Sequence, residues 1–411
     1  MKNKKGLISV LAIYLHVFFM GAGTNTLTYV YSKITLLDIL LVIYFFLNFN
    51  SIKKSIFISK NFLMILLLFI LVSVYSTIFN ISFGNTQISE TLSFLRYISY
   101  MMIIITYVDY LYITNSFANL FITFLLGILL VISFDIYFIQ YIGEYNFFEN
   151  YGRYIFGFKY FTDTYCFNSY FCYTGINVNT LSVLLSISLS LIIICLIDSN
   201  KINISIKQRI IVLILFSIFL FVAGGFGQKT AYFPFIFSIA IMPFILAYNF
   251  SLKNIKYYLL FSLLIIIFSI IYIDLINFFV GVLIDRTLRL DSQDVSSFYS
   301  RYELIIKAIN LVDVYSFLIG LGKNSYFYLT GINDPHNINV QLFLETGIFG
   351  TLLYLMMLIY IAYRSYQYSF FLLLLFIINY AILSNANGIA FQSHASFMVF
   401  AFIIYLGQKK V

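Results

Sequence analysis

The chain has 411 residues, of which 62% are apolar and only 10% are charged, and its mean hydropathy is +0.96. Soluble domains are about 45–50% apolar and about 25% charged, so this composition excludes an ordinary water-soluble globular protein. The net charge of +8 is spread between apolar segments, which indicates membrane topology and not nucleic-acid binding.

Twelve apolar runs follow one another along the chain, and most approach the roughly 20 residues that a spanning helix needs. They do not alternate with polar residues, so helices are favoured over a transmembrane barrel. The sequence therefore predicts an all-α integral membrane protein with about 12 transmembrane helices, forming a single polytopic domain over residues 1–411. The predicted spans are 7–23, 34–49, 61–80, 91–113, 117–142, 178–197, 209–224, 231–249, 257–283, 338–361, 369–384 and 389–406.

The distribution of lysine and arginine predicts the orientation of these spans. With both termini in the cytoplasm, 14 of the 24 basic residues fall in cytoplasmic ends and loops. Only Lys33, Arg96 and Lys229 fall in or beside short outer loops. Cytoplasmic loops are enriched in basic residues, so this pattern supports cytoplasmic termini. The basic residues after Met1 precede an apolar run without a clean cleavage site, which indicates a retained first span.

Two long outer segments, about 143–177 and 284–337, leave room for chemistry in water. The first contains Arg153 together with Cys166 and Cys172, which could pair, although two cysteines six residues apart are weak evidence. The three cysteines of the chain have no metal-binding spacing. The second segment repeats apolar residues at helical spacing, so we expect an amphipathic helix from about Arg301 to Val312 on the outer membrane surface.

Outer cations are candidates for binding phosphate oxygens. Lys229 lies in a glycine-rich turn, 224–230, which could form an anion-binding nest or be a plain tight turn. Arg286, Arg289 and Arg301 lie in the second outer segment, and arginine binds phosphate in bidentate fashion. The alternative is that these arginines face water or lipid headgroups, and Arg286 and Arg289 have nearby aspartates with which they could pair.

The sharpest local signal is Asp334-Pro335-His336-Asn337, directly before the tenth span. Aspartate as N-cap with proline in the first helical position predicts a helix start at this point. His336 would then lie in the first turn, where the helix dipole disfavours imidazolium and leaves a neutral base. The alternative is an interfacial histidine that only hydrogen-bonds a loop.

The tenth span carries an ionisable residue and two glycines. Glu345 lies nine residues into the helix from His336, and a carboxylate in a span is usually functional or paired. Gly347 and Gly350 would permit close helix packing. His16, deep in the first span, is expected to be buried and hydrogen-bonded. Further ionisable residues in spans, of undecided role, are Asp38, Asp135, Asp274 and His394.

The segment from Arg301 to Gly350 resembles the signature of the O-antigen polymerase and O-antigen ligase superfamily of bacterial envelope glycosyltransferases. The resemblance rests on Arg301, Gly320-Leu321-Gly322, His336-Asn337, Glu345, Gly347 and Gly350, together with the twelve-span layout and the long outer loop. It implies a donor glycan on undecaprenyl diphosphate at the outer face of the cytoplasmic membrane.

Within this resemblance, His336 is the expected catalytic base and Arg301 the expected diphosphate clamp. Lys229 stands where the family usually has arginine. Further candidate substrate-binding residues are Arg153, Arg286, Arg289 and Asn337. The first outer loop has no acidic residue, unlike that of metal-dependent membrane glycosyltransferases, so no metal and no other cofactor is expected.

The function expected from these features is polymerisation of lipid-linked repeat units into O-antigen or capsular polysaccharide in the bacterial inner membrane, with a chain-length regulator as a possible partner. The related alternative is a ligase that transfers the glycan to lipid A core. A flippase for the same lipid-linked sugar is a third hypothesis, but most spans have no basic residue in their middle. Polymerases are also expected to have an arginine–glycine spacing in two outer loops that this chain lacks.

Overall fold

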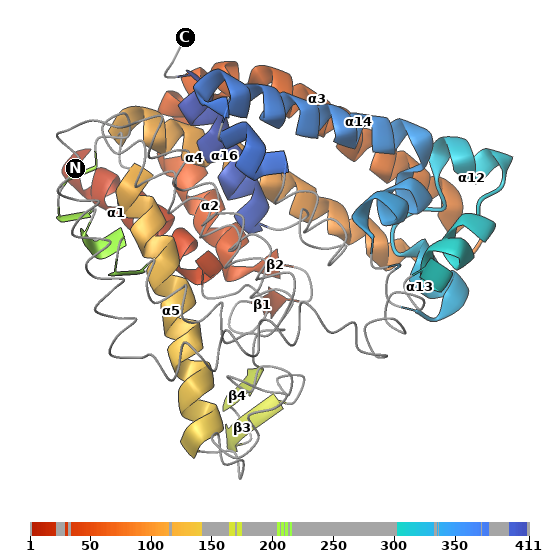
Figure 1. Cartoon of the computed structure of the whole chain (residues 1–411), viewed down its shortest axis with the longest axis horizontal. Helices are drawn as coiled ribbons and strands as arrows, with labels where there is room; N and C mark the ends of the chain where they lie inside the picture. The colour runs from red at the N-terminus through yellow and green to blue at the C-terminus, as the bar shows by residue number, and fades with distance from the viewer. Residues whose placement is uncertain are drawn as a thin grey trace. The chain divides into compact units, whose positions relative to one another are not determined.

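The computed structural model (Figure 1) describes most of the first third of the chain and most of residues 302–408. Contacts between Cα atoms divide the chain into two units, Met1–Gly127 with Ser297–Val411, and Ile128–Ser296. The described residues are 2–21, 29–31, 34–114, 117–141, 164–168, 171–174, 204–205, 207–208, 210–212, 214–215, 302–332, 335, 337–370, 372–377 and 394–408.

The described residues are mainly helical, as the apolar runs predict. The helices of the first unit are α1 (Lys2–Gly21), α2 (Leu36–Leu47), α3 (Phe49–Ile81), the 3-10 helix η1 (Ile88–Ser93), α4 (Phe94–Thr114), the first part of α5 (Phe117–Tyr141), α12 (Val314–Ile319), α13 (Ser325–Thr330), α14 (Ile338–Tyr368) and α16 (His394–Gln408). Residues 302–310 and 372–377 are also helical. A short hairpin of β1 (Tyr29–Tyr31) and β2 (Ile34–Thr35) joins α1 to α2.

Three helical stretches in the described part are long and apolar enough to cross a membrane: Ile52–Ile81, Ile88–Thr114 and Ile338–Tyr368. Shorter apolar helices are Ile8–Phe18, Leu37–Leu47, Phe117–Leu130 and Ser396–Gln408. The helical membrane character is therefore confirmed for these regions. The spans predicted at 178–197, 231–249 and 257–283 lie outside the described residues, so the count of twelve stays a prediction.

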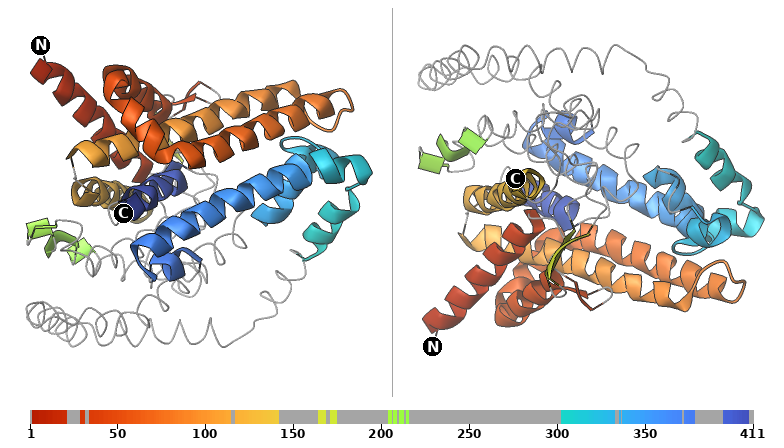
Figure 2. Two further views of the ribbon diagram at one scale, coloured as in Figure 1. Left: turned by 90° about the horizontal axis from the view of Figure 1, so that it is seen from above. Right: turned by 90° about the horizontal axis from the view of Figure 1, so that it is seen from below.

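Four helices of the first unit form a closed ring of neighbours. α3 packs against α4 and α14, and α16 packs against the same two helices from the opposite side (Figure 2). α2 lies against α4, and α1 packs on α2. Since α14 and α16 come more than two hundred residues after α4, this ring joins the two ends of the chain into one body.

Aromatic side chains fill the centre of this ring. Tyr100 of α4 stacks on Phe397 of α16 with ring centroids 4.3 Å apart. Phe62 of α3 packs edge-on against Phe397 and Phe400, and all four side chains are buried. Offset and edge-to-face aromatic pairs add to the free energy of apolar burial, so these contacts stabilise the ring.

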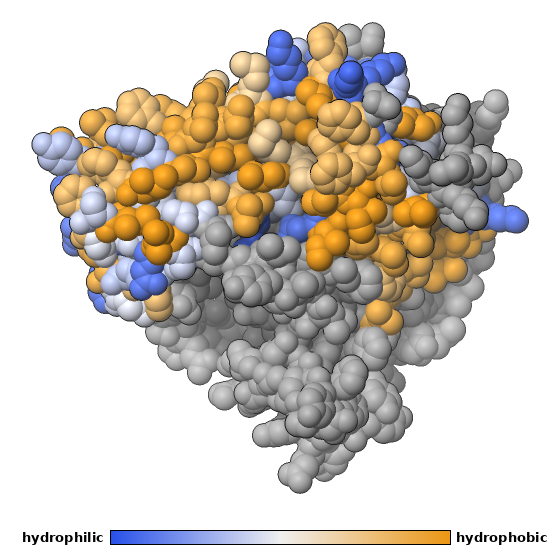
Figure 3. Space-filling model, turned by 180° about the vertical axis from the view of Figure 1, so that it is seen from behind, coloured by the Kyte–Doolittle hydropathy of each residue, from blue (hydrophilic) through white to orange (hydrophobic). Residues whose placement is uncertain are grey.

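The outer faces of the long helices are apolar as well. On α14 the exposed large side chains recur every three or four residues, which places them on one stripe of the helix. They are Phe349, Leu352, Met356, Ile359, Tyr363 and Tyr366, with Leu355 exposed beside Met356. Figure 3 shows a broad hydrophobic area over the described residues of one face. Such a large exposed apolar surface is typical of a protein that lipid surrounds.

Several polar residues inside the described helices form hydrogen bonds with one another. His16 is fully buried, and its Nδ1 lies 2.6 Å from the hydroxyl oxygen of Tyr107, so the prediction for this histidine is confirmed. The hydroxyl of Ser99 donates to the carboxylate of Asp38. These pairs satisfy polar groups that would be costly to leave alone in an apolar interior.

The buried carboxylate of Asp109 joins three helices, and its removal should destabilise them. Asp109 accepts hydrogen bonds from Tyr44 and Ser55 at 3.2 and 2.8 Å. Replacing Asp109 with alanine leaves the hydroxyls of Tyr44 and Ser55 without their acceptor. We therefore expect the free energy of unfolding to fall by about 1–3 kcal/mol. Thermal unfolding in detergent measures this loss. Asp109→Asn keeps an acceptor oxygen and should lose less; equal losses would contradict this role.

The end of the predicted second outer segment is compact. Residues 302–310 are helical, which agrees with the amphipathic helix predicted at about 301–312. Ala308, Leu321, Tyr326 and Leu344 form a small buried cluster that joins this helix to α13 and α14. The hydroxyl of Tyr326 also donates to the carbonyl of Leu304 at 3.1 Å.

In the second unit, the described residues include one hairpin and part of a helix. Strands β3 (Thr164–Asn168) and β4 (Phe171–Thr174) pair antiparallel within the predicted first outer segment. Residues 207–215 are helical where they are described, around the predicted start of the seventh span. Contacts divide the chain into these two units, so the single domain expected over 1–411 stays a prediction.

Candidate functional site

The start of α14 is where the structure reaches the predicted site. Of the predicted site residues, the structure describes only Asn337. His336, Arg301, Lys229, Arg286, Arg289 and Arg153 lie outside the described residues. The site can therefore be built from the segment that leads into His336-Asn337 and from the helix that follows.

The N-cap predicted for this helix is wrong. Asn337, not Asp334, is the N-cap: its side-chain oxygen accepts from the backbone N–H groups of Asn339 and Val340 at 3.0 and 3.2 Å. Pro335 precedes the helix and is not its first residue. The asparagine side chain satisfies two orphan donors of the first turn, and this displaces the start by three residues. His336 directly precedes the N-cap in the chain and does not follow it.

This cap makes a testable contribution to stability. We expect Asn337→Ala to lower the free energy of unfolding by about 1 kcal/mol, because two N–H groups of the first turn lose their acceptor. Asn337→Asp keeps an acceptor oxygen and should unfold close to the wild-type temperature. A melting curve of Asn337→Ala that coincides with that of wild type would show that the cap contributes nothing.

α14 is broken by a sharp kink nine residues after its start. Gly347 has φ +65° and ψ −167°, a conformation that glycine adopts and other residues essentially do not. The kink separates a short segment, Ile338–Thr346, from the long apolar part of the helix. The prediction that Gly347 permits close packing is correct about proximity, but its partner is a loop and not another spanning helix.

The partner of the kink is the loop between α12 and α13. A Cβ atom on Gly347 would collide with backbone atoms of Leu318 and Gly320. Reciprocally, a Cβ atom on Gly320, which has φ +80°, would collide with the backbone of Glu345 and Thr346. Two backbones therefore touch without intervening side chains, and we call this contact the glycine joint (Gly320–Gly322 against Leu344–Gly347).

Hydrogen bonds at the glycine joint use the carbonyls that the kink leaves without helical partners. The N–H of Leu321 donates to the carbonyl of Leu344 at 2.6 Å, and the N–H of Gly322 donates to that of Glu345 at 3.1 Å. The hydroxyl of Ser76 on α3 also donates to the carbonyl of Glu345, at 2.7 Å. Buried backbone groups need partners, so the kink and the loop stabilise each other.

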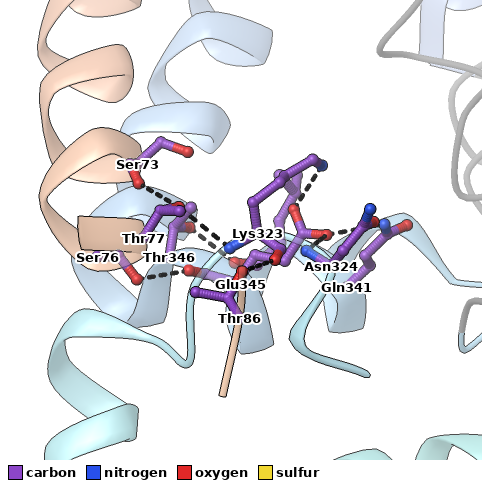
Figure 4. A network of polar contacts seen from close by, with 10 residues as sticks. Ser73, Ser76, Thr77, Thr86, Lys323, Asn324, Gln341, Glu345 and Thr346 are labelled. Carbon is purple, nitrogen blue, oxygen red and sulfur yellow. Dashed lines mark hydrogen bonds and ion pairs between the residues drawn. The ribbon is translucent and has the colours of Figure 1, made fainter. Parts of the chain in front are cut away.

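An ion pair lies beside the joint (Figure 4). The Lys323 Nζ atom lies 2.7 Å from Oε2 of Glu345, whose side chain is 2% exposed. The other oxygen, Oε1, accepts from the side-chain amide of Gln341 at 3.0 Å and from the backbone N–H of Asn324 at 3.3 Å. Glu345, which the sequence singles out as costly in a span, is thus paired and fully hydrogen-bonded.

The environment keeps Lys323 charged. Burial is the largest single influence and would lower the pKa of its ammonium group, but the charge and hydrogen bond of Glu345, together with Tyr97 and Glu90, outweigh it in sum. The pKa of Lys323 is therefore raised well above its ordinary value. At neutral pH the side chain of Lys323 is therefore an ammonium cation beside Glu345.

Polar side chains of α3 and of the turn that follows it hold the same loop in place. The Asn80 amide donates to the carbonyl of Gly320 at 2.9 Å. Thr77 Oγ1 accepts from the backbone N–H of Lys323 at 3.1 Å, and Thr86 donates to the Lys323 carbonyl at 2.6 Å. The end of α3 and the turn after it therefore fix the loop between α12 and α13, and this loop in turn contacts α14, as the network in Figure 4 shows.

Two further carboxylates belong to this region. Tyr328 of α13 donates its hydroxyl hydrogen to Glu90 of η1 at 3.2 Å, and desolvation together with this carboxylate raises the pKa of Tyr328. Asp313 caps α12, and hydrogen bonds from Ser316 lower the pKa of its carboxyl. Among the described residues no group of three potential metal ligands occurs. Glu90 thus connects η1 to α13, and Asp313 stabilises the start of α12.

Lys323 is the residue that the sequence analysis missed. It lies in the second outer segment, 284–337, without a charged neighbour in the sequence that would single it out. The available signal was Glu345, because a carboxylate inside an apolar helix requires a partner, and Lys323 follows the Gly320-Leu321-Gly322 motif directly.

Comparisons with known proteins identify no relative. No protein-family model matches the chain, and neither the curated proteins nor the solved structures include a match. The geometry of the site and the chemistry of its residues are therefore the basis for assigning a function.

Proposed function

We propose that the protein is a metal-independent, inverting glycan polymerase of the bacterial inner membrane. It would join undecaprenyl-diphosphate-linked repeat units into O-antigen or capsular polysaccharide at the outer face. The observation that carries the proposal is the glycine joint. The motif residues Gly320–Gly322 contact the motif residues Glu345 and Gly347 across a loop, at the end of the helical segment that begins two residues after His336.

The contacts of the first unit agree with the proposed topology. Asn80 and Thr86, at the predicted outer end of the third span, contact the predicted outer segment at Gly320 and Lys323. At predicted cytoplasmic ends, Gly407 lies against Arg364. Each contact joins segments that the proposal places on the same side of the membrane.

The chemistry assigned to the site needs a base and a cation clamp. We assign the base to His336, whose imidazole would take the proton of the acceptor hydroxyl as its oxygen attacks the anomeric carbon. The bond from that carbon to the diphosphate oxygen breaks, and the diphosphate leaves with the electron pair. Arg301 and Lys229 would stabilise its charge, with Arg286, Arg289, Arg153 and Asn337 as further substrate contacts.

The joint gives this chemistry a rigid support. Catalytic groups must be held closely in position, and sites supported by packed elements are more precise than free loops. The segment Ile338–Thr346 is held by Lys323, Ser76 and the backbone of Leu321 and Gly322. His336 is two residues before this segment, so a fixed helix start would limit where its side chain can reach.

A deletion strain complemented with variants tests the proposal. We expect deletion to leave single repeat units at the cell surface, wild type to restore the polysaccharide ladder on a gel, and His336→Ala to leave it absent at equal protein level. Tyr315→Ala, which alters a side chain 75% exposed on α12, is the matched control and should restore the ladder.

Other outcomes would assign the protein differently. Full-length chains accumulating on the carrier lipid would indicate a ligase, and loss of repeat units from the outer face would indicate a flippase. If the His336→Ala variant restored the polysaccharide ladder, His336 would not be the catalytic base.

A further inference from the structure

The hairpin of the second unit brings two of the three cysteines together. Cys166 on β3 and Cys172 on β4 are Cα partners in the antiparallel register, between the pairs Tyr165–Tyr173 and Asn168–Phe171. Their spacing of six in the sequence was weak evidence for a pair. The register adds an independent observation, because it makes the two positions direct cross-strand neighbours.

The dimensions of an antiparallel ladder suit a disulfide. Directly opposed residues have Cα atoms about 4.5 or 5.5 Å apart, depending on whether the pair exchanges backbone hydrogen bonds. Disulfides join residues with Cα atoms about 4.4–6.8 Å apart. Both kinds of cross-strand pair fall in this range, and opposed residues lie on the same face of the ladder.

We propose that Cys166 and Cys172 form an intrachain disulfide that closes the tip of the β3–β4 hairpin. The hairpin lies within residues 143–177, which the basic-residue pattern places outside the cytoplasm, and disulfides persist in such oxidising compartments. The inference goes beyond the proposed activity and needs only the outer placement of this segment.

The bond forms by exchange with an envelope dithiol–disulfide oxidase. The thiolate of one cysteine attacks the oxidase disulfide and gives a mixed disulfide, and the second thiolate then displaces the oxidase. One Sγ–Sγ bond replaces two S–H bonds. The two electrons and two protons pass to the oxidase, which leaves as a dithiol.

Thiol counting on the full-length protein tests the proposal. Cells are lysed with maleimide present, the protein is denatured in the same reagent, and its intact mass is measured before and after reduction. With three cysteines in the chain, we expect one adduct before reduction, on Cys195, and three after. Three adducts before reduction would overturn the proposal.

Single variants and peptide mapping identify the partners. Cys172→Ser should give two adducts both before and after reduction, and Cys195→Ser should give none before and two after. Trypsin leaves all three cysteines in one peptide, because no lysine or arginine lies between Lys159 and Lys201. Chymotrypsin cleaves after Phe167, Tyr170 or Phe171, so the expected product is two fragments held together until reduction.

Two further results separate the alternatives. A link from Cys195 to either other cysteine, or a disulfide-linked dimer on a non-reducing gel, would overturn the proposal. In a strain without the oxidase we expect the wild-type count before reduction to rise from one adduct to three. These measurements do not depend on polysaccharide. The disulfide proposal can therefore be correct if the polymerase proposal is wrong, and the polymerase proposal can be correct if the disulfide is absent.

Discussion

Replacing Gly347 with alanine is expected to destabilise the protein strongly. The alanine must adopt φ +65°, and its Cβ atom would collide with the backbone of Leu318 and Gly320. Strain of about 1–3 kcal/mol from the backbone conformation adds to about 1–3 kcal/mol from overpacking. The neighbours are backbone atoms of the joint, so they cannot move aside as a flexible side chain could.

A second glycine at positive φ shows the cost of an added methyl group without a collision. Gly84 has nearly the same φ, +74°, but no atom lies within 4 Å of an added Cβ. Gly84→Ala should therefore cost only the backbone term, about 1–2 kcal/mol. Thermal unfolding in detergent, followed by size-exclusion chromatography, compares the two variants. If Gly347→Ala unfolds at the same temperature as Gly84→Ala, the close contact at the joint does not exist.

Breaking the Lys323–Glu345 pair is expected to have the second largest effect. Either Lys323→Met or Glu345→Leu leaves one charge buried without its partner, and such changes typically cost about 3–5 kcal/mol. The double variant removes both charges. We therefore expect it to be more stable than the sum of the two single losses predicts, with a coupling of up to about 3 kcal/mol.

An exposed pair on the same outer segment is the control. Glu303 and Lys307 are one helical turn apart on residues 302–310, and both are exposed. Exposed pairs at this spacing contribute about 0.3–0.5 kcal/mol, so Glu303→Gln should barely change the unfolding temperature. Additive losses for Lys323→Met and Glu345→Leu would contradict a direct interaction.

The pH dependence of this contribution follows from the raised pKa of Lys323. A group with a raised pKa in the folded state contributes stability that is fully present below its unfolded pKa, about 10.4 for lysine. That contribution is lost only as pH rises through the folded value. The difference in stability between wild type and Lys323→Met should therefore stay constant from neutral pH to about pH 9.

The sequence predicts the ends of a helix well where a single apolar run makes up the whole helix. The run 117–142 corresponds to α5, Phe117–Tyr141, and the run that starts at 338 corresponds to α14. α3 is different, because it begins at Phe49 and not near residue 61. Lysines lower the mean hydropathy of residues 50–60, yet Ile52, Ser55 and Ser59 lie on one buried face there.

The candidate site was predictable only in part, for two physical reasons. Asp334-Pro335 and Asn337 are competing helix-start signals, and only the geometry decides that the Asn337 side chain satisfies the first-turn donors. The partner of Glu345 comes from a loop 22 residues earlier, and no periodicity relates positions across a loop. Glycines at positive φ, such as Gly320 and Gly347, likewise reveal their partners only in three dimensions.

We propose that this chain alone transfers lipid-linked glycan through His336 without a metal. The most direct test is purified protein in liposomes with undecaprenyl-diphosphate-linked repeat units and excess chelator, followed by measurement of glycan length on the carrier. We predict chains of many repeat units with wild type and Tyr315→Ala, and only single units with His336→Ala. Single units with folded wild-type protein, or long chains with His336→Ala, would contradict this account.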